Sequence, residues 1–283
     1  MTFREIFSNY IKELQAIYSK GEASAITHII FSHFANLSKS ALALSGNNIA
    51  DTATAAALQE ALEKLLKHIP VQYITGEAWF YNLKFKVNDQ VLIPRPETEE
   101  LVQEAINYLK GTQGKTILDV GTGSGCIPIS IKKNVPDAEI ISVDISPCAL
   151  QTAAENATAN NVEIDFRQID FLDEGTHHSL PVFDVIISNP PYIPENDKDF
   201  LDKNVALHEP HLALFVTQND PLIFYRKIFL FAQEHLATNG KIFLEVHEDY
   251  ATETVAIFNE ENYFTEIKKD MQGKERMVIV SKR

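Results

Sequence analysis

The sequence predicts an α/β fold, in which a mostly parallel sheet with a C-terminal antiparallel hairpin is preceded by a small all-α bundle. Three observations predict it. From residue 115 onward, β-forming runs alternate with helical stretches, which is typical of a parallel sheet covered on both faces. The last two β-forming runs are separated only by a short polar turn, which favours antiparallel pairing. Before residue 70, apolar residues instead recur at helical spacing.

The first 70 residues are predicted to form helices. Apolar residues in Phe3–Leu14 recur at positions i, i+3, i+4, i+7, i+8 and i+11, which makes one apolar stripe. A second stripe runs through Ala23–Leu37. Asp51 is placed as the N-cap of a third helix, which reaches Leu66 and ends before a proline. Residues 1–70 are therefore expected to form a small helical domain.

Residues 71–94 change to β-forming side chains with partial alternation, interrupted by Asn88-Asp89. We predict a β-hairpin linker over this range and a second, larger domain over residues 95–283. Helices are expected near residues 125–134, 147–160 and 221–237. The predicted strands are Thr116–Val120, Glu139–Val143, Glu163–Arg167, Phe183–Ser188, Lys241–Val246, Tyr263–Lys268 and Arg276–Ser281.

Composition excludes several classes of protein. The 283 residues suggest about two domains, and the net charge of −14 lies wholly in residues 91–283. An acidic chain is unsuited to binding nucleic acid mainly through its phosphates. Two cysteines are too few for a disulfide scaffold or a four-cysteine zinc site. The His177-His178 pair lies in a polar loop that we expect to be solvated, so no metal site is predicted. No apolar run reaches ~18 residues and the N-terminus lacks a secretory signal, so we expect a cytoplasmic protein without a membrane span.

A glycine-rich turn follows the first strand of the predicted sheet and opens a helix. It consists of Gly121, Thr122, Gly123, Ser124 and Gly125. Glycines let a ligand approach the backbone closely, and the helix that follows offers free N–H groups. The spacing departs from the dinucleotide pattern G-x-G-x-x-G because the third glycine comes one residue early, and no Lys-Ser/Thr pair follows to make a phosphate-binding loop.

Two acidic positions extend this candidate site. Asp144 ends the next strand, 21 residues after Gly123, where a carboxylate can accept hydrogen bonds from both ribose hydroxyls. The loop and Asp144 together fit a nucleoside ligand without a pyrophosphate, such as S-adenosyl-L-methionine; the alternative is a structural turn. After the third strand, Asp170 could accept from an adenine amino group while Phe171 stacks on the base. A turn aspartate and a core phenylalanine explain that pair equally well.

The second motif is Asn189-Pro190-Pro191-Tyr192, directly after the fourth strand. Two prolines restrict the backbone, so the Asn189 amide oxygen and the Pro190 carbonyl can form a rigid pair of acceptors, and Tyr192 adds a flat face. Two fixed acceptors beside a flat ring can bind a planar –NH2 group. Because the lone pair of an amide or aryl –NH2 is delocalised, two acceptors on its hydrogens would draw the nitrogen toward sp³ geometry. Catalysis would then come from positioning and electrostatics.

These motifs together resemble a known family. The glycine turn with Asn189–Tyr192 is similar to amino-directed S-adenosylmethionine methyltransferases, and residues 68–283 resemble the HemK/PrmC family more closely. The segments that carry the closer resemblance are Pro70–Gly76, Phe80, Leu92–Glu99, Ile117–Ile127, Asn189–Ile193, Glu209-Pro210, Ala213-Leu214, Asp270, Gly273 and Glu275-Arg276.

The resemblance implies a Rossmann-like class I S-adenosylmethionine-dependent methyltransferase domain at residues 95–283 and a substrate-docking role for residues 1–70. It implies methyl transfer to the side-chain amide nitrogen (N5) of the glutamine in the Gly-Gly-Gln motif of class-1 peptide chain release factors. The implied catalytic residues are Asn189, Pro190 and Tyr192, and Pro191 joins them in the substrate site. The implied cofactor-binding residues are Gly121, Thr122, Gly123, Ser124, Gly125, Asp144, Phe171 and Asn189.

Other functions are open to the same motifs. A DNA adenine N6-methyltransferase would use the same tetrapeptide, but it needs a basic face and a domain that holds a flipped base. Methylation of a glutamine in another protein is a further alternative, and a docking module without activity is a third. We expect a monomer that does not bind nucleic acid directly.

Overall fold

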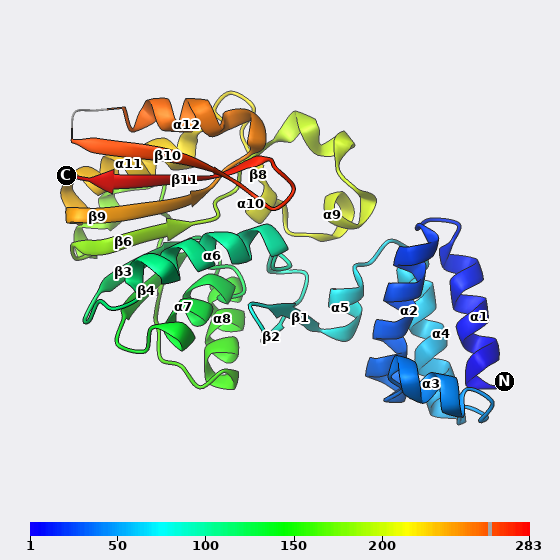
Figure 1. Cartoon of the computed structure of the whole chain (residues 1–283). Helices are drawn as coiled ribbons and strands as arrows, with labels where there is room; N and C mark the ends of the chain where they lie inside the picture. Colours follow the sequence, from blue (N-terminus) through cyan, green and yellow to red (C-terminus); the bar gives the residue numbers. More distant parts are fainter. Residues whose placement is uncertain (260–261) are drawn as a thin grey trace. The chain divides into compact units, whose positions relative to one another are not determined.

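The computed structural model describes residues 1–259 and 262–283, which form two compact units. The first, here called the helical unit, comprises Met1–Gly76 and Asp202–His208. The second, the sheet unit, comprises Glu77–Leu201 and Glu209–Arg283. Figure 1 shows the elements of both units along the chain. No helix of the described chain has both the length and the apolar character needed to cross a membrane.

The helical unit is built around one apolar cluster that includes Tyr10, Phe31 and Leu58. As predicted, Asp51 caps a helix, because its Oδ1 accepts from the Thr54 N–H at 2.9 Å. A short helix before it was not predicted. The helices are α1 (Phe3–Leu14), α2 (Lys20–Ala35), α3 (Lys39–Ser45), α4 (Thr52–Leu66), α5 (Val71–Thr75) and α9 (Lys203–His208).

The predicted hairpin over residues 71–94 is much shorter in the structure. Residues 71–75 form helix α5, and only β1 (Glu77–Phe80) and β2 (Leu83–Lys86) pair, antiparallel. The turn lies at Tyr81-Asn82, with φ of 49° and 60°, and not at Asn88-Asp89. A two-residue hairpin turn of type I′ needs positive φ at both positions, which asparagine tolerates and tyrosine rarely adopts. Tyr81 is held there by α6, since its N–H donates to Glu99 at 2.8 Å.

The sheet unit confirms the predicted α/β class. Its seven strands run in the order β10-β11-β9-β6-β3-β4-β5, with all neighbours parallel except at β11, which is antiparallel to both β9 and β10. Gly273, with φ of 85°, lies in the turn between the last two strands, as predicted. A separate short pair joins β7 (Ile193–Pro194) and β8 (Phe215–Val216). The seven strands are β3 (Thr116–Val120), β4 (Glu139–Asp144), β5 (Asp165–Gln168), β6 (Phe183–Ser188), β9 (Leu236–Glu245), β10 (Tyr263–Lys269) and β11 (Glu275–Lys282).

Helices cover both faces of this sheet (Figure 1). One face carries α6 (Pro96–Leu109), α7 (Cys126–Asn134) and α8 (Pro147–Ala159). The other carries α11 (Ile223–His235) and α12 (Ala251–Ile257), the latter not predicted. The shorter helices are α10 (His211–Leu214) and the 3₁₀ segments Glu174–Ser179, Glu195–Phe200 and Glu248–Tyr250.

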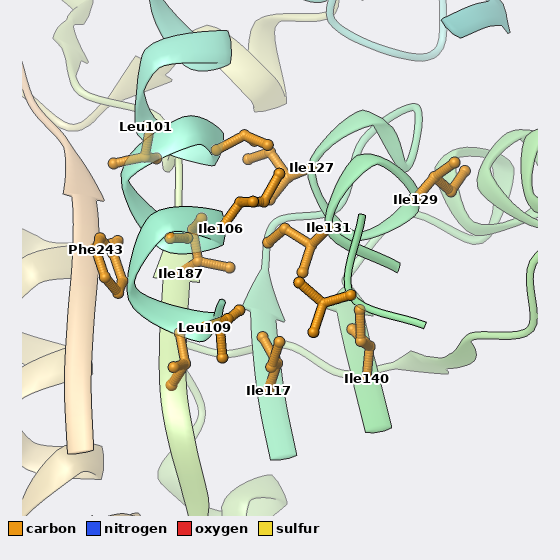
Figure 2. Close-up of a cluster of buried hydrophobic side chains, with 14 of the residues drawn as sticks. Leu101, Ile106, Leu109, Ile117, Ile127, Ile129, Ile131, Ile140, Ile187 and Phe243 are labelled. Atoms are coloured by element: carbon orange, nitrogen blue, oxygen red, sulfur yellow. The ribbon is translucent and has the colours of Figure 1, made fainter. Parts of the chain in front are cut away.

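Alternate residues of each strand enter the two cores, as the pleat requires. Ile117 of β3 packs under α6 and α7, whereas Leu118 faces α11. Figure 2 shows the first core, where Ile106 and Leu109 of α6 and Ile131 of α7 lie over the sheet. The strand order reverses between β3 and β6, and in open α/β sheets ligands bind at such a switch point, beyond the carboxyl ends of the strands.

Candidate active site

A cavity of about 300 Å³ opens at this switch point. Its size lies at the lower end of the range of small-molecule sites. Apart from the predicted site residues, most of the cavity wall is apolar, with Ile145, Leu172 and Phe224 among its side chains. The predicted site residues that line it are Gly121, Gly123, Asp144, Asp170, Phe171, Asn189 and Pro191.

The glycine turn is shaped by three left-handed residues. Gly121, Gly123 and Gly125 have φ of 79°, 54° and 79°. A Cβ at either of the first two would meet no atom within 4 Å, so these glycines leave space beside the cavity. A Cβ at Gly125 would lie 3.0 Å from Ile129 Cδ1 and 3.1 Å from Ala153 Cβ. Gly125 therefore allows α7 and α8 to approach closely, and the first two glycines expose the backbone.

The side chains of Thr122 and Ser124 are buried beneath the turn and do not line the cavity. The Ser142 hydroxyl lies 2.6 Å from Thr122 Oγ1 and 2.5 Å from Asp119 Oδ2. Burial raises the pKa of Asp119 to about 7. This polar cluster supports the turn from below, so any contact that Thr122 or Ser124 makes with a ligand has to come from the backbone.

Asp144 ends β4 at the edge of the cavity. Its Oδ2 accepts from the Gly123 N–H at 2.9 Å and its Oδ1 from the Ser146 N–H at 2.9 Å. Burial raises the pKa of this carboxyl, and the two backbone hydrogen bonds oppose that shift. A carboxylate offers about four lone-pair sites, so both oxygens can still accept from a ligand.

Phe171 is buried and lines the cavity beside Asp170. Its ring centroid lies 4.7 Å from that of His177 and 5.2 Å from that of Phe231. The expectation of a solvated loop is wrong for His177, which is buried with Nε2 2.9 Å from the Phe171 carbonyl oxygen. The 3₁₀ turn at Glu174–Ser179 folds this ring under the aromatic cluster. His177 therefore belongs to the wall that supports Phe171.

The Asn189–Tyr192 segment lies on the β6 side of the cavity. Asn189 and Pro191 reach the lining, while Pro190 and Tyr192 lie behind it. The Asn189 Nδ2 donates to Thr98 Oγ1 at 3.0 Å, and Thr98 donates to Glu245 Oε2 at 2.6 Å. The Tyr192 hydroxyl donates to the other oxygen, Glu245 Oε1, at 3.3 Å. One carboxylate thus anchors both ends of the tetrapeptide.

Glu245 and Thr98 were not predicted as site residues. Glu245 is buried at the carboxyl end of β9, and burial raises its pKa to about 7; burial also raises the pKa of Tyr192. An acid directly after the apolar run 242–244 is the same signal that indicated Asp144. Thr98, in the first turn of α6, gives no comparable signal.

An ion pair between a half-buried arginine and a buried glutamate lies behind another part of the wall. Arg95 lies 2.6 Å from Glu209 Oε1, and the Ile93 N–H donates to Glu209 Oε2 at 3.3 Å. The Glu209 side chain is only 1% exposed. It therefore fixes the segment before α6 to Pro210, which lines the cavity.

The two motifs are neighbours because their strands pair. In the parallel register of β3 and β6, Val120 lies opposite Ser188, so the chain enters Gly121 and Asn189 side by side. The cavity wall thus offers an open glycine backbone and a carboxylate, and next to them a primary amide. Such an arrangement can hold a nucleoside-like group and a planar –NH2 group next to each other.

Comparisons with known proteins identify the family to which the chain is similar. Family models match residues 100–208 (methyltransferase small domain) and residues 5–76 (PrmC N-terminal domain). The release factor glutamine methyltransferase of Flavobacterium psychrophilum is 39% identical over 99% of both chains, and that of Bacteroides thetaiotaomicron is 36% identical over 96% of this chain and 98% of its own. In fold, the chain is similar to a putative SAM-dependent methyltransferase from Streptococcus mutans, with a TM-score of 0.52 and 15% identity, covering 73% of this chain and 55% of that one.

Proposed function

The chain belongs to the release factor glutamine methyltransferase family, and from that membership we propose that it transfers a methyl group from S-adenosyl-L-methionine to the side-chain amide nitrogen (N5) of a glutamine. The glutamine is that of the Gly-Gly-Gln motif in class-1 peptide chain release factors. The observation that carries the proposal is the single cavity shared by the glycine turn and the Asn189–Tyr192 segment.

The residues on the glycine side fit S-adenosyl-L-methionine. When bound, it supplies a methyl carbon on a positively charged sulfur, which is left as a neutral thioether. Gly121 and Gly123 leave room beside the backbone, and Asp144 offers carboxylate oxygens to ribose hydroxyls. Phe171 and Ile145 add apolar surface for the base. Thr122, Ser124 and Gly125 contribute the shape of the turn.

The residues on the β6 side fit the substrate amide. The Asn189 Oδ1 and the Pro190 carbonyl would accept the two hydrogens of the glutamine –NH2, Pro191 would flank the side chain, and Tyr192 would hold the segment from behind through Glu245. Held in this way, the nitrogen would direct its lone pair at the methyl carbon, so that a C–N bond forms as the methyl–sulfur bond breaks with its electrons left on sulfur. The methylated nitrogen would then release one proton to water. We assign Asn189, Pro190 and Tyr192 to catalysis by positioning, since no strong general base is needed for an in-line displacement of this kind.

We expect the protein to act as a cytoplasmic monomer. Its two cysteines, Cys126 and Cys148, are free thiols, which suits a reducing compartment. Light scattering of the purified chain would test the monomeric state.

The proposal is tested by offering S-adenosyl-L-methionine with a labelled methyl group to a purified release factor. A second reaction contains the same release factor with the motif glutamine replaced by alanine, and a third contains duplex DNA. Label in the intact release factor alone is the expected result. Equal label in both release factors would contradict the assigned position, and label in DNA alone would favour the adenine methyltransferase.

A further inference from the structure

A buried hydrogen-bonded chain joins three distant parts of the sequence behind the substrate side of the cavity. It runs from Asn189 after β6 to Thr98 in α6 and on to Glu245 at the end of β9. Thr98 is 2% exposed and Glu245 1%. Resting on the function proposed above, we propose that Thr98 and Glu245 are positioning residues that select the orientation of the Asn189 amide in which Oδ1 faces the substrate.

The donors and acceptors of the chain permit only one direction. Above the pKa of about 7, Glu245 is ionised and its carboxylate only accepts hydrogen bonds, so the single proton of the Thr98 hydroxyl goes to Glu245, over 2.6 Å. The Thr98 oxygen must then accept from its other neighbour, and the only donor on the Asn189 side chain is its –NH2. The Asn189 Nδ2 is therefore directed at Thr98, and Oδ1 is left for the cavity.

This orientation matters because the substrate group is itself a donor. A glutamine –NH2 presents two hydrogens, and it needs an oxygen opposite each of them. With the Asn189 amide reversed, one –NH2 would face another, and a hydrogen bond would be replaced by a contact between donors. Only one of the two orientations of the asparagine amide presents its oxygen to the substrate, so a neighbouring group has to fix that orientation.

Glu245 has a second contact that supports the same role. Its other oxygen accepts from the Tyr192 hydroxyl, three residues along from Asn189. The groups that influence the carboxylate are Arg276 of β11, Glu97 of α6 and the phenols of Tyr192 and Tyr225. The Tyr225 hydroxyl donates to the Glu245 backbone oxygen at 3.1 Å and so fixes the strand end.

The experiment compares three threonine variants in the full chain. Thr98→Val removes the hydroxyl with little change of shape, Thr98→Ser keeps it, and Thr254→Val is the matched control. Thr254 is also fully buried, but its hydroxyl has no hydrogen-bond partner among the described residues. Each variant is assayed for kcat and KM on release factor, for the Kd of S-adenosyl-L-methionine by calorimetry, and for its melting temperature.

We expect Thr98→Val to lower kcat by about 10- to 100-fold, because misplacing a group that orients the reacting atom costs rate at this scale. Its cofactor Kd and KM should stay within about threefold. Thr98→Ser should restore kcat to within about threefold of wild type, and Thr254→Val should resemble wild type.

Two results would overturn the inference. One is a kcat for Thr98→Val equal to that of wild type; the other is an equal loss in Thr98→Val and Thr98→Ser, which would assign the effect to packing. Failure of the proposed function is separate, because wild-type protein would then not label the release factor at all.

Discussion

Replacing Glu245 with glutamine should remove most of one pH-dependent step in the stability of the sheet unit. Burial raises the pKa of this carboxyl from 4.5 to about 7. Between these two values the folded state holds a proton that the unfolded state has released, so stability falls as the pH rises. A shift of this size lowers the free energy of unfolding by about 3 kcal/mol between pH 4 and pH 8. Glutamine has the same shape and does not titrate.

The measurement is the free energy of unfolding by urea, followed by circular dichroism at several pH values between 5 and 8. The fall across this range should be about 2 to 3 kcal/mol smaller in Glu245→Gln than in wild type. Asp119→Asn should reduce the fall similarly, since the pKa of Asp119 is also raised to about 7 by burial. Glu155→Gln is the control, because Lys86 lowers the pKa of this exposed carboxyl and its titration lies below the range.

The reasoning would be refuted if wild type and Glu245→Gln lost the same stability between pH 5 and pH 8. That outcome would mean that Glu245 is ionised throughout, stabilised by Thr98, Tyr192 and Arg276 more strongly than burial opposes it. A larger fall in Glu245→Gln than in wild type would refute it as well.

Three further predictions concern the turn and the substrate side. Asn189→Ala should lower kcat by about 10² to 10³ while the cofactor Kd, measured by calorimetry, changes only a few-fold; undiminished turnover would exclude its role. Gly125→Ala should lose more stability than Gly123→Ala in urea titrations, because its Cβ meets Ile129 and Ala153, whereas Gly123→Ala should lose more cofactor affinity; the reverse order would show that the turn is oriented differently. Asn156→Ala should lower the free energy of unfolding by about 2 to 3 kcal/mol, because it leaves the Ser124 carbonyl and both backbone groups of Lys86 without their buried partner; a loss below about 0.5 kcal/mol would contradict this.

The central strands of the sheet unit could be predicted because they are buried on both faces, which makes them apolar runs, and β3 and β6 have their predicted bounds. The C-terminal strands β10 and β11 lie within a residue of their predicted positions, although β10 is a partly exposed edge strand. Prediction was poorer where tertiary contacts override local preference. Tyr81 adopts a positive φ because α6 binds its backbone, and α5 forms where the side chains favour strands. The local sequence shows neither the contact of Tyr81 with α6 nor the helical conformation of residues 71–75.

The candidate site likewise contains residues that the sequence could predict and residues that it could not. Gly121, Asp144 and Asn189 follow strands directly, so the topology of a parallel sheet brings them to one edge, and spacing was enough to find them. Thr98, which holds Asn189, and Asn156, which holds the Ser124 carbonyl of the glycine turn, were missed because each acts only through long-range partners, from the first turn of a helix or from its interior. A sequence shows which residues end strands, but not which helix side chain reaches back to them.

The buried carboxylate at Glu245 makes sense only beside an asparagine. An aspartate at position 189 would present an oxygen in either orientation, but it would add a charge beside the substrate amide. Asn189 stays neutral and is correct in one orientation only, so a fixed acceptor behind Thr98 is needed to hold it there. The ionised carboxylate serves because it cannot donate, and its burial lowers stability above the pKa of about 7. Glu245→Gln should therefore gain stability at pH 8, and because its amide can turn either its oxygen or its –NH2 toward Thr98, it should no longer fix the Asn189 orientation that Thr98→Ser preserves.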